Sequence, residues 1–100
     1  MATMSERLSE ARVKIEDARD VVRSDRGSSP VLIAVVDEFA NKAEKAAAAD
    51  DERSAVIELE QAGDSAKAAV EADTGVADAT RQAVLDAHLV ICIAKAKLER

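Results

Sequence analysis

The sequence predicts an all-α protein, an antiparallel up-down four-helix bundle made of two αα-hairpins. Apolar residues recur at alternating steps of four and three along four successive segments, which places them on one face of each helix. Alanine and the long charged side chains, which dominate the composition, are good helix formers. No segment alternates apolar and polar residues for long, so strands are not expected. A chain of 100 residues is expected to form a single domain, residues 1–100.

The first two segments carry recognisable start signals. Thr3 and Glu6 are spaced as a capping box, and Gly27 is expected to close the first helix. Ser29 is the expected N-cap of the second helix, with Pro30 at its first helical position. The apolar stripe of the first segment is Met4, Leu8, Ala11, Ile15, Ala18 and Val22, and that of the second is Leu32, Val36, Phe39, Ala43 and Ala46.

The third and fourth segments are separated by Thr74 and Gly75. Acidic residues 50–52 precede the third segment, and Lys95 and Lys97 stand near the end of the fourth, as the helix dipole favours. The third stripe is Val56, Leu59, Gly63, Ala66 and Val70. The fourth stripe is Ala77, Thr80, Val84, Ala87, Ile91, Ala94 and Leu98.

The junction between the second and third segments contains neither glycine nor proline. The third stripe is offset from the second by one residue, about 100° around a helix, which favours a turn near Asp50. One continuous helix of about 44 residues is the alternative. Such a helix could not pack within one small domain and would imply a dimer.

A shift of 48 residues maps the first stripe onto the third and Gly27 onto Gly75. This correspondence suggests two stacked αα-hairpins in one bundle. Any two helical stripes align at some shift, however, so the sequence leaves both a true duplication and a chance match open.

Small residues occupy many of the stripe positions. The chain has 22 alanines and one aromatic residue, so the helices are expected to approach each other closely. Gly63 lies within a helical stripe, where glycine costs about 1 kcal/mol relative to alanine. It either allows a close approach, of a neighbouring helix or of a bulky side chain such as Phe39, or is a tolerated defect.

Composition and charge exclude several classes of function. The formal net charge of -6 repels phosphate backbones and anionic lipids, so neither nucleic acid nor a membrane is an expected partner. The apolar run of residues 89–94, which no other run exceeds, is far shorter than the roughly 20 residues that span a bilayer. The N-terminus has no secretory signal pattern, and the chain has a single cysteine. A cytoplasmic location is therefore expected.

His88 and Cys92 are the only histidine and the only cysteine, and they lie one helical turn apart. They could supply half a metal site or a reactive thiolate. Zinc needs three or four ligands, and the Glu-x-x-His motif of di-metal bundles is absent because Leu85 stands three residues before the histidine. We expect no catalytic residues, no metal and no cofactor, and so no enzymatic activity.

Two segments are more apolar than one buried face requires, which suggests an interface. The candidate interface residues are Val31, Ile33, Val35, Leu85, Leu89, Val90 and Ile93. The leading hypothesis is a non-enzymatic structural or protein-interaction bundle that associates with itself through its second and fourth helices. The alternatives are an adaptor or chaperone that holds an amphipathic helix of a partner, and a small ligand- or metal-binding bundle.

Overall fold

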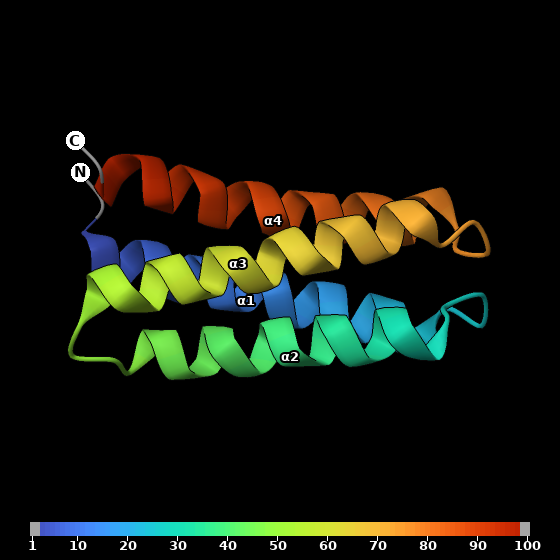
Figure 1. Cartoon of the computed structure of the whole chain (residues 1–100), viewed down its shortest axis with the longest axis horizontal. Coiled ribbons are helices and arrows are strands. Elements are labelled where there is room, and N and C mark those ends of the chain that lie inside the picture. Colours follow the sequence, from blue (N-terminus) through green and yellow to red (C-terminus); the bar gives the residue numbers. More distant parts are fainter. Residues whose placement is uncertain (1–2, 99–100) are drawn as a thin grey trace.

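Four helices lie side by side along one long axis in the computed structural model, which describes residues 3–98 (Figure 1). They are α1 (Met4–Ser24), α2 (Pro30–Ala47), α3 (Glu52–Ala72) and α4 (Asp78–Leu98). Each helix contacts the next one along the chain, and α1 also contacts α4, so successive helices occupy neighbouring corners of the bundle. The predicted all-α four-helix bundle is confirmed. The α2–α3 loop lies at one end, and the α1–α2 and α3–α4 loops meet at the other (Figure 1).

The helices begin where the sequence places their caps. The Glu6 backbone N–H donates to the Thr3 hydroxyl at 3.1 Å, and the Thr3 backbone N–H donates to the Glu6 carboxylate at 3.2 Å, which completes the predicted capping box. The hydroxyl of Ser29 accepts from the backbone N–H of Leu32 at 3.1 Å. Asp51 caps α3 in the same manner. These bonds satisfy donors that the first helical turn leaves free.

The second and third segments are separate helices, so the alternative of one continuous helix is wrong. Helix α2 ends at Ala47 and α3 begins at Glu52. The stripe on α3 is out of phase with the stripe on α2, and a continuous helix would turn one of them away from the core. Breaking the helix lets both stripes face inward.

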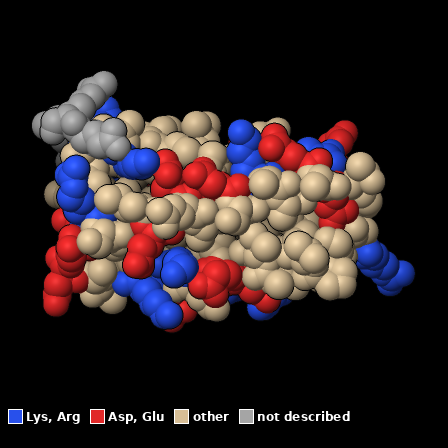
Figure 2. All heavy atoms as spheres, in the orientation of Figure 1, with Lys and Arg blue, Asp and Glu red and all other residues tan. Residues whose placement is uncertain are grey.

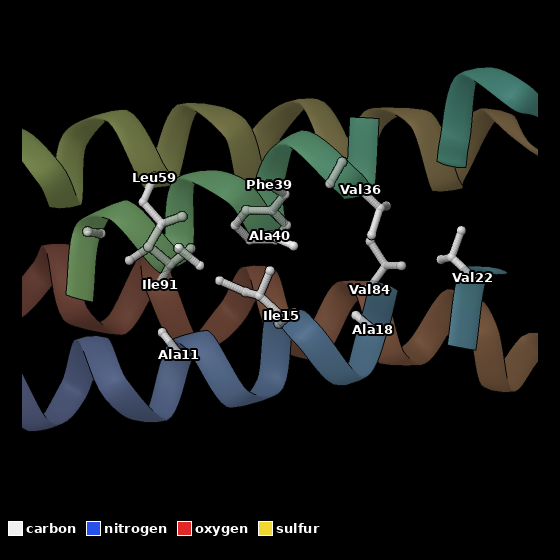
Figure 3. Close-up of a cluster of buried hydrophobic side chains, with 14 of the residues drawn as sticks. Ala11, Ile15, Ala18, Val22, Val36, Phe39, Ala40, Leu59, Val84 and Ile91 are labelled. Atoms are coloured by element: carbon white, nitrogen blue, oxygen red, sulfur yellow. The ribbon is translucent and has the colours of Figure 1, made fainter. Parts of the chain in front are cut away.

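The predicted stripes form the core, apart from a few end positions. Met4 and Leu98 are only half-buried, and Ala77 is exposed because it precedes the first turn of α4. Figure 3 shows side chains of all four helices meeting along the axis of the bundle. The largest fully buried side chains are Phe39, Leu8, Ile15, Leu32, Leu59, Ile91, Val22, Val36, Val56, Val70 and Val84.

Gly63 provides space for two side chains from neighbouring helices. A Cβ atom at this position would lie 3.1 Å from Phe39 Cζ and 3.2 Å from His88 Cδ2, which is tighter than ordinary contact. The ring of Phe39, the one aromatic side chain of the protein, is fully buried. The close approach of Phe39 is therefore the explanation that holds for the glycine.

The two αα-hairpins are structurally equivalent under the 48-residue shift. Helix α1 spans residues 4–24 and α3 spans residues 52–72, while α2 and α4 begin at residues 30 and 78. The first N-cap, Thr3, corresponds to Asp51, and the C-caps Asp25 and Asp73 also correspond. Helix α4 extends three residues further than α2 under this shift, but the match of the other helix bounds and of the caps involves more than apolar spacing and supports an internal structural repeat.

Two aspartates tie the hairpins together where their loops meet. The Oδ2 atom of Asp25 accepts from the backbone N–H of Ala77 at 2.9 Å and from the buried Thr80 hydroxyl at 2.6 Å. Its counterpart Asp73 accepts from the backbone N–H of Ser29 at 2.8 Å. Each carboxylate also accepts from the glycine two residues later, Gly27 or Gly75. Each loop thus holds the start of the helix that follows the other loop.

These hydrogen bonds favour the ionised form of both carboxylates. The Thr80 hydroxyl, followed by the N–H groups of Ala77 and Gly27, lowers the pKa of Asp25. The backbone N–H groups of Ser29 and Gly75 lower the pKa of Asp73.

Gly75 lies in the break between α3 and α4 as predicted, whereas Gly27 has a different place from the one predicted. Gly27 was expected to close α1, but α1 ends at Ser24 with Asp25 as its C-cap, and no described glycine has a positive φ. A Cβ atom at Gly75 would lie 2.8 Å from the carbonyl oxygen of Gly27. The two glycines therefore allow the two loop backbones to touch.

Candidate functional site

The seven candidate interface residues lie on two helices that are diagonal in the bundle. Both α2 and α4 pack against α1 and α3, which separate them. Val31, Leu89 and Ile93 are exposed, whereas Ile33, Val35, Leu85 and Val90 are half-buried against the core. The structure therefore places the candidates in two separate surface regions, and no single flat interface can include all of them.

The α2 region lies near the end where the loops meet. Val31 is 66% exposed, while Ile33 and Val35 turn towards the neighbouring helices and are half-buried. The N-terminal half of α2 is largely uncharged surface (Figure 2). Val31 is the only candidate side chain of this region that is exposed, so the region by itself offers little apolar area for an interface.

The α4 region presents two large side chains one helical turn apart. Leu89 is 56% exposed and Ile93 is 44% exposed. Val90 and Ile93, together with Arg7 and Glu10 of α1, line a small groove of about 160 Å³ between α1 and α4. The α4 region thus continues towards α1, with charged side chains at its edge.

A larger open groove of about 410 Å³ runs between α2 and α3. Val35 and Ala62 supply its apolar surface, and Glu38, Lys42 and Glu58 supply its charged groups. The groove exists because the α3 side of the seam carries small side chains, among them Ala62 and Ser65. An elongated, partly apolar groove between two helices could take another helix.

His88 has a hydrogen-bond partner that the sequence did not identify. Its Nε2 atom lies 2.7 Å from Oδ1 of Asp64 on α3. The Cys92 sulfur lies 3.4 Å from the same Nε2 and 3.8 Å from Nδ1. In a nucleophilic triad, the thiol and the carboxylate must hold opposite ring nitrogens. The thiol lies closer to Nε2, which Asp64 already holds, than to Nδ1, so these distances do not favour a proton relay from the thiol.

The environment of Cys92 favours the neutral thiol. Burial raises the pKa of this group, and the carboxylates of Glu60 and Asp64 raise it further. A thiol activated for catalysis has a lowered pKa instead. Within residues 3–98, no group of three or more His, Cys, Asp or Glu side chains is placed to hold a metal ion.

Sequence reasoning also missed another polar link across the α3–α4 seam, the ion pair between Lys95 and Glu60 at 3.2 Å. Glu60 and Asp64 are four residues apart, as are His88 and Cys92, so each pair lies on one face of its helix. The spacing shows which residues share a face. Only the rotation of the packed helices shows which faces meet.

Comparisons with protein-family models, curated proteins and solved structures found no match to this chain. None of the helices in the described range is both long enough and apolar enough to cross a membrane.

Proposed function

We propose that the protein is a non-enzymatic interaction bundle that associates with itself. The observation that carries the proposal is the exposure of Leu89 and Ile93 on a helix that already buries a complete core stripe. Adjacent exposed apolar side chains of this size are typical of protein contact sites. The partner is a protein, since the net charge of -6 disfavours nucleic acid and anionic membranes. A reducing cytoplasmic location suits the single free thiol of Cys92.

The test is the molar mass in solution as a function of concentration. Sedimentation equilibrium, or light scattering after gel filtration, should show a mass that rises above 10.6 kDa as the concentration increases. A range from about 1 μM to about 1 mM covers both tight and weak dimers. A mass that stays at the monomer value throughout this range would overturn self-association.

The α2–α3 groove favours a second candidate, an adaptor that holds an amphipathic helix of a partner protein. Its apolar surface at Val35 and Ala62 lies beside Glu38, Lys42 and Glu58, which suits a helix with one apolar face and mixed charges. A synthetic amphipathic helical peptide should shift the amide resonances of Val35 and Ala62 in a titration monitored by nuclear magnetic resonance. If the amide resonances of the groove residues do not shift, the adaptor proposal is wrong.

A further inference from the structure

The internal repeat provides a matched comparison for the surface of α4. Under the 48-residue shift, Leu89 corresponds to Asn41 and Ile93 corresponds to Lys45, and all four residues are exposed. The half-buried Val90 corresponds to Lys42, which is also half-buried. Structurally equivalent positions therefore carry polar residues on α2 and apolar residues on α4.

This comparison shows that the bundle does not need apolar residues at these positions of α4. Asn41 and Lys45 occupy the same places on an equivalent helix that buries an equivalent stripe. Leu89 is 56% and Ile93 is 44% exposed, and this exposed area gains no hydrophobic stabilisation in the monomer, since such stabilisation requires removal of apolar area from water. The exposed apolar area of Leu89 and Ile93, which lie one helical turn apart, is therefore available for a contact outside the monomer.

The charges beside this pair are arranged for a second copy of the same helix. Asp86 lies on the N-terminal side of Leu89, and Lys97 lies on the C-terminal side of Ile93, and both are exposed. The midpoint of positions 89 and 93 is 91, and that of positions 86 and 97 is 91.5. One two-fold axis near residue 91 would therefore pair Leu89 with Ile93 and Asp86 with Lys97 of an antiparallel copy.

We propose that the protein forms a two-fold symmetric homodimer in which α4 packs antiparallel against α4 of a second copy. Leu89 and Ile93 lie at the axis, and the Asp86–Lys97 pairs lie at the two ends of the contact. This arrangement is self-complementary, as the interface of a two-fold dimer must be. The long side of the bundle measures 38 Å by 19 Å, which is close to the ~800 Å² per partner of a standard interface. The inference rests on the proposed self-association and adds its surface and geometry.

The decisive variant replaces each apolar residue by its counterpart in the repeat, Leu89→Asn with Ile93→Lys. The bundle already accepts these residues at the equivalent positions of α2, so the helical content should be unchanged by circular dichroism. The dimer dissociation constant should rise by at least about 30-fold, because the residues at the centre of an interface carry most of the binding energy. The matched control is Val31→Asn, on the diagonal helix, which should change the dissociation constant by less than about 2-fold.

Charge exchange tests the antiparallel geometry. Asp86→Lys alone and Lys97→Asp alone should each weaken the dimer, and the variant that carries both should restore it, because every cross-copy pair is then reversed. If both single variants weaken the dimer and the double variant does not recover, the proposed orientation is wrong.

The outcomes separate this inference from the proposed function. A dimer that survives Leu89→Asn with Ile93→Lys, or that is lost in Val31→Asn, leaves self-association in place and overturns the α4 contact. A wild-type protein that stays monomeric overturns both.

Discussion

Replacing Gly27 by alanine is expected to force apart the two loops that join the hairpins. A Cβ atom at this position would overlap the carbonyl oxygen of Gly75. The obstacle is backbone, so it cannot rotate away as a side chain would. Neither glycine has a positive φ, and the substitution therefore tests the close approach of the loops with no added torsional strain.

The expected loss follows from the geometry of the contact. Overpacking of a well-packed site costs about 1–3 kcal/mol, and a backbone obstacle favours the upper part of that range. Alanine also lowers the conformational entropy of the unfolded chain, which stabilises the folded protein by about 0.4–1 kcal/mol. A net loss of about 2 kcal/mol lowers the Tm of a 100-residue domain by roughly 8–16 °C.

Thermal and urea unfolding followed by circular dichroism measure this loss. Gly75→Ala is the matched control, because its Cβ atom would lie 2.8 Å from the Gly27 carbonyl oxygen, a smaller intrusion. Its loss of stability should be the smaller of the two. If Gly27→Ala is as stable as the wild type, the loop backbones do not touch and the reasoning fails.

Three further predictions concern Asp25 where the two loops meet, Phe39 in the core and the thiol of Cys92. The pKa of Asp25 is lowered from 3.8, so its stabilising effect is present above that pH and is lost as the pH falls through and below it. In urea unfolding from neutral to acidic pH, the free energy of unfolding should fall less steeply for Asp25→Asn than for the wild type. Equal slopes for the two proteins would contradict this. Phe39→Ala should cost about 3–5 kcal/mol in urea unfolding, because the fully buried ring leaves a cavity; a loss under about 1 kcal/mol would mean that the ring is not in the core. Because burial raises the pKa of the Cys92 thiol above its ordinary value, the pH profile of its alkylation should have a midpoint above that of a free cysteine, and a midpoint below that of a free cysteine would point to an activated thiol.

Much of the fold could be predicted because its determinants are local. The stripe through Leu8, Ile15 and Val22 is buried as its spacing requires. The capping box of Thr3 and Glu6 forms within four consecutive residues, so it depends on no distant contact. The turn after Ala47 also follows from a local feature, the phase slip between two neighbouring stripes.

The candidate interface residues were predicted less well than the core. The spacing identified Leu89 and Ile93 as outward-facing apolar residues on their helix, and both are exposed. It did not show that the other candidates on this helix, Leu85 and Val90, are half-buried against the core, because that depends on how the neighbouring helices pack. The repeat was open at the level of sequence, since alanine and valine identities are common in this composition, and the corresponding bonds of Asp25 and Asp73 across the two loops support it.

The sequence by itself determined the helices, the N-terminal caps at Thr3 and Ser29, and most of the residues that each helix buries, because these depend on interactions among residues about four positions apart or closer. Tertiary structure alone decided which helix faces meet. The bond between His88 and Asp64 joins residues 24 positions apart, and the bond between Asp25 and Ala77 joins residues 52 apart. Such pairs depend on the rotation of each helix about its axis, which is set when the whole bundle packs its small and large side chains together.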